Sequence, residues 1–180
     1  MANEKRMDQV ILGLLSHESM TGYEIKKRLD TRLHFFWGGS YGSIYPTLNG
    51  LEKKGFVTKE QAKENGRDKI IYTITKEGHK NLQEWLALPV VKDEMRFETI
   101  LKIFFGSELG AEGSLKHIEH FEHKLTDAMP FLQKSVEQLK PIADQEQHGY
   151  YLLSAMCGVK MYEALLEWCE DAKKILNEKK

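Results

Sequence analysis

The stretch of sequence that decides the fold is GSIYPTLNGLEKKG, at residues 42–55. Three apolar residues recur at the spacing of one helical face: Ile44, Leu48 and Leu51. Because proline lacks the amide hydrogen that a helix interior needs, Pro46 places the start of this helix near Ser43. Gly55 stands where a left-handed C-cap is expected. The opposite face presents Pro46, Asn49, Gly50 and Lys53, with Ser43 and Thr47 at its sides.

Two further helices are predicted upstream of this stretch. From Met7 the apolar residues fall on one face of a helix that ends within Ser16–Met20. Thr21 and Glu24 then have the spacing of a capping box, in which each side chain satisfies the backbone amide of the other. A second helix is therefore expected to begin here and to run to about Asp30.

A β-hairpin and a fourth helix are predicted downstream. Phe56–Lys59 and Lys69–Thr73 are rich in β-branched and aromatic residues, and Asn65-Gly66 between them is the strongest short signal for a hairpin turn. Thr75–Leu88 indicates the fourth helix, which ends before Pro89. Its apolar side is formed by Leu82, Trp85 and Leu86. Residues 1–90 therefore have the order of a winged helix-turn-helix domain, in which the third helix can enter a major groove and the hairpin forms the wing.

Residues 91–180 are expected to form a second, helical domain. Helical patterns run over residues 95–105, 112–140 and 145–177, and two of them carry heptad-like seams that need partner helices. Pro130 lies inside the first seam and is expected to kink or interrupt that helix. The fold class is thus mainly α, and we expect the second domain to hold a dimer together. The candidate dimerisation residues are Phe121, Leu125, Leu152, Ala155, Val159, Tyr162, Leu166 and Cys169.

Composition and charge are consistent with an intracellular protein of two small domains. The 180 residues are 41% hydrophobic, enough for an ordinary core. Residues 1–90 carry 14 basic and 11 acidic side chains, whereas residues 91–180 carry 12 and 16, so the two halves differ in sign. The two cysteines form no CxxC motif, and neither a signal peptide nor a membrane-spanning run is evident, so a cytoplasmic location is expected.

The residues expected to face DNA have chemistry that suits a duplex. Ser43, Thr47 and Asn49 are short hydrogen-bonding residues that can approach base edges. Ser40 and Tyr41 lie near a helix N-terminus, which favours phosphate. The basic candidates for phosphate contacts are Lys53 on the helix and Arg67 and Lys69 on the wing.

Five strings together resemble the PadR family of transcriptional regulators. They are ILGLL at 11–15, TGYEI at 21–25, GSIYPTL at 42–48, LEKKG at 51–55 and YTITKEG at 72–78. The resemblance implies a homodimer that binds a palindromic operator, usually as a repressor and often released by a small aromatic effector. It points to Tyr23, Ser40, Tyr41, Ser43 and Pro46-Thr47 as DNA-facing, and we also include Thr21 of the TGYEI string among the candidates. The helical second half is less specifically similar to the C-terminal domain of longer family members and of virulence activators.

Two motifs in the sequence could indicate other chemistry. Gly38–Gly42 matches the G-x-S-x-G elbow of serine hydrolases, but the chain lacks the strand and helix alternation of the α/β sheet that the elbow needs. His117, His120 and His123 could bring two imidazoles near a metal, although an acidic or cysteine ligand at the usual offset is missing. We therefore expect no enzymatic activity, no metal and no cofactor.

Two alternatives concerning partners stay open. Trp85 and Trp168, with Tyr150, Tyr151 and Tyr162, could line a pocket for a flat aromatic effector, although such residues more often fill a core or an interface. Tyr45 could belong to the core, because it borders the apolar stripe of its helix. A helical, dimeric adaptor that binds protein instead of DNA is the alternative function.

Overall fold

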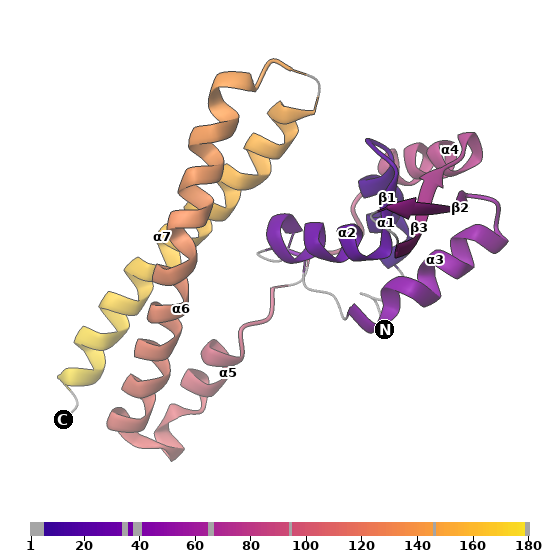
Figure 1. Ribbon diagram of the computed structural model, residues 1–180. Coiled ribbons are helices and arrows are strands. Elements are labelled where there is room, and N and C mark those ends of the chain that lie inside the picture. Colours follow the sequence, from indigo (N-terminus) through magenta and orange to yellow (C-terminus); the bar gives the residue numbers. More distant parts are fainter. Residues whose placement is uncertain are drawn as a thin grey trace. The chain divides into compact units, whose positions relative to one another are not determined.

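The chain divides into two compact units, Met1–Asp93 and Glu94–Lys180, which are described separately. The computed structural model describes residues 6–33, 36–37, 41–64, 67–93, 95–145 and 147–178. Figure 1 shows a small sheet with helices around it in the first unit and a long helical hairpin in the second. Among the described residues, no helix is long and apolar enough to cross a membrane.

The first unit is a winged helix, and its described residues form four α-helices and three strands. Its elements in chain order are α1 (Met7–Leu15), β1 (Met20–Thr21), α2 (Gly22–Arg28), a π-helical turn (Leu29–Leu33), a 3-10 turn (Tyr41–Ser43), α3 (Ile44–Lys53), β2 (Val57–Glu64), β3 (Arg67–Ile74) and α4 (Lys76–Leu86). The sheet is antiparallel with the order β1-β3-β2. The first half of the chain therefore has the predicted order of helices and hairpin.

Local capping rules account for the start of α2 and for the end of α3. The Thr21 side chain accepts a hydrogen bond from the Glu24 amide, and the Thr21 amide donates to the Glu24 carboxylate, so the predicted capping box is present. At the end of α3, Gly55 has a φ of 73°. Its amide donates to Glu52 and the Phe56 amide donates to Leu51, which is the Schellman arrangement that stops a helix.

One apolar core joins the helices of this unit to the sheet. The buried members are Met7, Ile11, Leu12, Leu15, Met20, Ile25, Leu29, Ile44, Leu48, Leu51, Val57, Tyr72 and Leu82. The three apolar residues predicted for α3 are all buried here. One prediction for α4 is wrong, because Leu86 is 64% exposed although it was expected on the apolar side.

The sheet is larger than predicted. Both hairpin strands are eight residues long and pair from Val57 with Ile74 to Glu64 with Arg67, so the sequence prediction cut each strand short. The outer part of the hairpin is mostly polar, with Ala62 and Ile70 as its apolar residues, and shows no regular apolar alternation, which is why it was missed. The predicted turn, Asn65-Gly66, lies outside the described residues. Strand β1 was not predicted at all, because it is two residues long and its partner lies fifty residues away.

The second unit consists of α5 (Glu98–Phe104), α6 (Gly110–Leu139) and α7 (His148–Asn177), with 3-10 turns at Gly106–Glu108 and Lys140–Ile142. Of the two effects predicted for Pro130, interruption of the helix is wrong, since α6 runs through it, and a kink stays a prediction. Pro130 and Thr126, whose carbonyl loses its hydrogen-bond partner, belong to the exposed side of α6. Met129 and Leu132 remain buried, so packing holds the helix on both sides of the proline.

The two heptad seams pack against each other within one chain. Ile118, Leu125 and Cys169 form a buried cluster of α6 and α7, with Phe121, Tyr162, Leu166 and Trp168 packed around it. Lys173 of α7 donates to both oxygens of Glu122 on α6, at 2.6 and 2.7 Å. The seams predicted a partner helix but could not say which chain supplies it. Leu125, Ala155 and Cys169 are buried within the single chain, and the contribution of the seam residues to a dimer stays a prediction.

Candidate nucleic-acid interface

Helix α3 presents a stripe of small and polar residues opposite its buried face. Ile44, Leu48 and Leu51 are buried, whereas Pro46, Asn49 and Lys53 are exposed and Ser43, Thr47 and Gly50 are half-buried. Pro46 is the third residue of α3, within the first turn, where its missing amide hydrogen has no helical acceptor. Six residues of this stripe can thus be reached from outside, as the sequence predicted for this helix.

Gly50 lies in the middle of the stripe with open space above it. A Cβ atom built on Gly50 would meet no atom within 4 Å, and its φ is not positive. Neither packing nor backbone conformation therefore requires glycine at this position. Glycine in a helix interior costs about 1 kcal/mol relative to alanine, so the open space at Gly50 comes at the expense of helix stability.

Tyr45 joins α3 to the start of α2. A Cβ atom built on Gly22 would lie 2.7 Å from the Tyr45 ring, so the ring lies directly on the Gly22 backbone. The Tyr45 side chain is nevertheless 58% exposed, which shows that it is not a core residue. Tyr45 therefore lies at the border of the apolar stripe of α3, as predicted. Its ring packs on the start of α2, and the rest of the side chain is exposed.

The start of α2 carries an exposed aromatic residue beside the capping box. Tyr23 is 70% exposed. The Thr21 hydroxyl donates to the Glu24 carboxylate at 2.8 Å and accepts from the Glu24 amide at 3.2 Å. Most of the hydrogen-bonding capacity of this hydroxyl is therefore used within the chain. Hydrogen bonds from the Thr21 amide and hydroxyl hold the pKa of Glu24 below its ordinary value, and the charge of Lys69 contributes to the same shift. Lys69 is half-buried and therefore also serves the fold.

The replacement of Glu24 by alanine is expected to reduce the free energy of unfolding by about 1 kcal/mol at pH 7, the usual contribution of a helix cap. Because the pKa of Glu24 is lower in the folded chain than its ordinary 4.5, the stabilisation is complete above that value and is lost as the pH falls. Urea unfolding at pH 7 and pH 3 measures the difference. Glu77→Ala, in the first turn of α4, is the matched control, and an equal loss at both pH values would contradict this role.

The base of the wing is tied to α3 by an ion pair. Lys59 of β2 places its Nζ 2.8 Å from an Oε atom of Glu52 on α3. Lys59 stands opposite Tyr72 in the sheet, and burial raises the pKa of Tyr72. The pair links α3 and the wing, so the two predicted DNA-facing elements are held in one arrangement. Sequence reasoning missed it, since the two residues lie in different elements and follow no helical or strand spacing.

Three predicted residues cannot be placed in this interface. Ser40 lies outside the described residues, together with most of the G-x-S-x-G string. The structure describes the backbone of Tyr41 and Arg67 but not their side chains. Their proposed contacts with DNA stay predictions, as do those of the other candidates.

The two candidate effector residues belong to different units. Trp85 is half-buried and packs against the core of the winged helix. Trp168 packs around the core of the helical unit, with its ring centroid 6.3 Å from that of Phe121 in an edge-on arrangement. Both therefore contribute to packing. A role in effector binding stays a prediction.

The histidine row on α6 does not gather a metal-ligand set. Among the described residues, no group of three histidine, cysteine or acidic side chains is placed to hold a metal ion. The Nδ1 atom of His123 lies 2.9 Å from a carboxylate oxygen of Asp127, one turn along the same helix. This pairing on the surface of α6 gives at least one of the three histidines a local partner.

Comparison with known proteins covers nearly the whole chain. Residues 11–84 match the transcriptional regulator PadR-like family, and residues 95–177 match the virulence activator alpha C-terminal family. The negative transcriptional regulator PadR of Bacillus subtilis is 28% identical over 166 residues, which cover 87% of this chain and 91% of the relative.

Solved structures agree with this comparison. The PadR-like regulator BC1756 of Bacillus cereus has a TM-score of 0.81 at 26% identity, covering 96% of this chain and 99% of the other. The protein smu.1604c of Streptococcus mutans has a TM-score of 0.77 at 31% identity, covering 96% of each chain. Bacillus subtilis PadR in complex with operator DNA has a TM-score of 0.80 at 26% identity, covering 94% of this chain and 98% of the other. The same protein in complex with p-coumaric acid has a TM-score of 0.72 at 25% identity, covering 95% of this chain and 98% of the other. The matched domains, their order and their fold show that this chain belongs to the PadR-like family of transcriptional regulators.

Proposed function

We propose that this protein is a homodimeric repressor that binds a palindromic operator through α3 and the wing. The observation that carries the proposal is the accessible stripe of α3, with Pro46, Asn49 and Lys53 opposite a fully buried apolar face. Short polar side chains on such a helix can reach base edges in a major groove. The operator complex of Bacillus subtilis PadR and the description of that relative as a negative regulator support the same function.

The salt dependence of DNA binding tests this proposal. The protein is titrated onto a labelled duplex from its own upstream region at several salt concentrations, and the log-log slope is expected to be several units. Lys53→Ala and Arg67→Ala should each lower the slope by about one, because each removes a phosphate contact. Lys80→Ala, on the exposed side of α4, is the control and should leave the slope unchanged. Failure to bind the duplex at low salt would favour the protein-binding adaptor.

The replacement of Gly50 by alanine is expected to separate stability from DNA binding. The methyl group meets no neighbour in the protein, so the free energy of unfolding should rise by about 0.5–1 kcal/mol. The same methyl group projects from the DNA-facing stripe, so operator affinity should fall about tenfold, the order of one poorly fitting contact. Gly13→Ala in α1, which also meets no neighbour, is the matched control for stability. If the two variants bind the operator equally well, the stripe does not approach DNA closely at Gly50.

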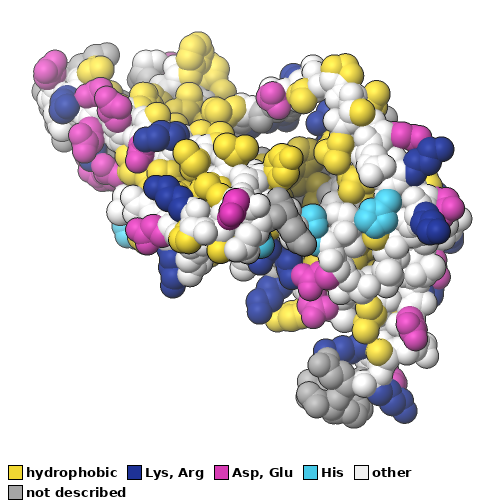
Figure 2. Space-filling view, turned by 90° about the horizontal axis from the view of Figure 1, so that it is seen from above, with side chains coloured by type: hydrophobic (Ala, Val, Ile, Leu, Met, Phe, Trp, Pro, Cys, Tyr) yellow, Lys and Arg dark blue, Asp and Glu magenta, His cyan; other side chains and the backbone are white. Residues whose placement is uncertain are grey.

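Exposed apolar residues on α5 provide the surface that we propose for dimerisation. Leu101, Phe104 and Phe105 are 59%, 80% and 58% exposed and are spaced three and four residues apart. Figure 2 shows that hydrophobic side chains also reach the surface among charged ones on the face seen from above. Clusters of large apolar side chains open to water usually mark an interaction site. A two-fold dimer would fix the spacing of two half-sites near one helical turn of DNA, about 34 Å.

A small aromatic effector is the remaining part of the proposal. The p-coumaric acid complex of Bacillus subtilis PadR supports an aromatic acid as the effector class. Such a ligand releases the operator only if it binds the DNA-free arrangement more tightly than the DNA-bound one. Tryptophan fluorescence during titration with phenolic acids tests whether Trp85 or Trp168 lies near the ligand, and an unchanged spectrum would remove both residues from the proposal.

A further inference from the structure

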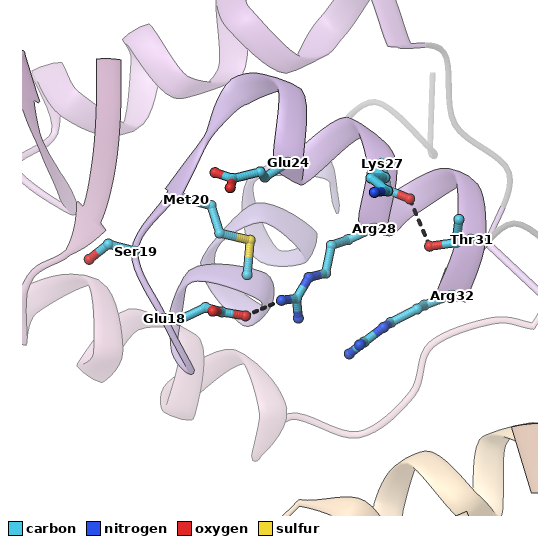
Figure 3. A pocket seen from close by; sticks show the side chains of 8 residues that line it. All are labelled: Glu18, Ser19, Met20, Glu24, Lys27, Arg28, Thr31 and Arg32. Carbon is cyan, nitrogen blue, oxygen red and sulfur yellow. Dashed lines mark hydrogen bonds and ion pairs between the residues drawn. The ribbon is translucent and has the colours of Figure 1, made fainter. Parts of the chain in front are cut away.

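A pocket of about 340 Å³ opens beside α2 and the π-helical turn that follows it (Figure 3). The connection from α1 to β1 forms one wall, and α2 with the turn forms the other. The lining residues are Glu18, Ser19, Met20, Glu24, Lys27, Arg28, Thr31 and Arg32. The volume lies at the low end of the range of small-molecule sites, about 300–1,000 Å³. Met20 is the one apolar side chain of the lining, so the pocket suits a small polar ligand and not a flat aromatic one.

The charges around this pocket are unequal. Three cationic side chains line it against two carboxylates, Glu18 and Glu24. Glu24 already accepts hydrogen bonds from the Thr21 amide and hydroxyl, and Glu18 forms an ion pair with Arg28. In the part of the chain that the structure describes, Lys27 and Arg32 have no ion-pair partner. The pocket therefore carries positive charge that its own carboxylates leave uncompensated.

Arg28 and Arg32 are placed to act together. They lie four residues apart on one helical face, where like charges repel. Figure 3 shows both side chains extending into the same space, with Glu18 at the end of Arg28. The Arg28 side chain is 28% exposed, so part of its surface is withdrawn from water and its ion pair is less screened than one on an open surface. Guanidinium groups match the planar oxygen pairs of carboxylates and phosphates.

We propose that this pocket binds a small oxyanion, a phosphate or a carboxylate free in solution, between Arg28 and Arg32. In the absence of the anion, Glu18 occupies the guanidinium of Arg28 and acts as an internal competitor. A phosphate of bound DNA is disfavoured as the occupant. Tyr23, the residue of α2 proposed to face DNA, lies nine residues before Arg32. The Arg32 end of the pocket is therefore separated from Tyr23 along the chain, whereas Glu24 of the lining is next to Tyr23, so competition with DNA is one arm of the test.

Calorimetric titration of the full-length protein with inorganic phosphate and with succinate, at constant ionic strength, tests the site. Saturable binding of at least one of them is expected. Arg32→Gln should weaken it about tenfold, the loss of one charge-assisted hydrogen bond. Glu18→Gln should strengthen it about two- to fivefold, because it removes a partly exposed ion pair that competes for Arg28. Lys80→Gln, which removes a cation far along the sequence on α4, is the control for net charge.

Three outcomes would overturn the proposal. The first is that neither anion binds saturably. The second is that Lys80→Gln weakens binding as much as Arg32→Gln, or that Glu18→Gln weakens it, which would indicate general charge effects or a purely structural pair. The third is that a saturating DNA duplex displaces the anion while Arg32→Gln lowers the salt slope of DNA binding by about one. In that case the positive charge serves a DNA phosphate.

Discussion

The replacement of Gly78 by alanine is expected to unfold the winged helix under conditions in which the wild-type chain is folded. A Cβ atom at Gly78 would lie 2.2 Å from the carbonyl oxygen of Phe56 and 2.8 Å from the Ile74 side chain. The first of these atoms belongs to the backbone and also accepts the Thr75 amide at 3.0 Å, so it cannot move without loss of that hydrogen bond. The cost should reach at least about 3 kcal/mol, the upper range of overpacking in a tight core.

Urea unfolding followed by circular dichroism measures this loss. Gly13→Ala is again the matched control, since its methyl group meets open space and should slightly stabilise α1. A Gly78→Ala protein with wild-type stability would show that α4 can move away from the β2 end without cost. In that event the start of α4 would not be fixed by the close approach to Phe56.

If the proposed dimer forms through α5, Phe104→Glu is expected to convert it into a monomer and to reduce operator affinity by roughly 100-fold or more. The Phe104 side chain is 80% exposed in the single chain and packs edge-on against the Phe105 ring at a centroid distance of 5.1 Å, so the substitution removes an exposed ring contact and not a core contact. In a dimer interface it would bury an unpaired charge among apolar side chains, which is strongly unfavourable. A monomer reads one half-site, and specific DNA binding exceeds non-specific binding by about 10³–10⁷, so loss of half the contacts is severe.

Sedimentation velocity and DNA titration, performed on the same preparation, measure the two effects. Val91→Glu places the same charge at an exposed apolar residue outside α5 and should leave both unchanged. A Phe104→Glu protein that is still dimeric would move the dimer surface away from α5. A monomeric variant with wild-type operator affinity would instead separate dimerisation from DNA binding and overturn the two-fold arrangement.

Most of the winged helix could be predicted from sequence, because local rules determine its boundaries. The capping box at Thr21 and Glu24 depends on a spacing of three residues, and the end of α3 depends on one glycine with a positive φ. The buried stripe of α3 follows from its period alone, which also placed Asn49 and Lys53 on the accessible side. These features need no knowledge of distant residues.

Several of the features that sequence reasoning missed depend on distant contacts. Strand β1 exists because Met20 meets Tyr72 across the sheet, and the ion pair from Lys59 to Glu52 joins two elements of different type. Gly78 was not singled out, since its requirement comes from the Phe56 carbonyl, twenty-two residues earlier. Pro130 was overinterpreted, because packing on both sides of a proline can preserve a helix that propensity alone would break.

The closure of the heptad seams within each chain has a consequence for the choice of partner. In a coiled coil between two chains, the seam residues decide which subunits can pair. Here Leu125 of α6 and Cys169 of α7 lie in one cluster of the same polypeptide. A substitution in one helix can therefore be compensated by a substitution in the other helix of the same chain. If the proposed dimer forms, discrimination between this protein and a related regulator in the same cell would then rest on the surface of α5 that we propose for dimerisation. A few substitutions there would be enough to permit, or to prevent, the exchange of subunits between paralogues.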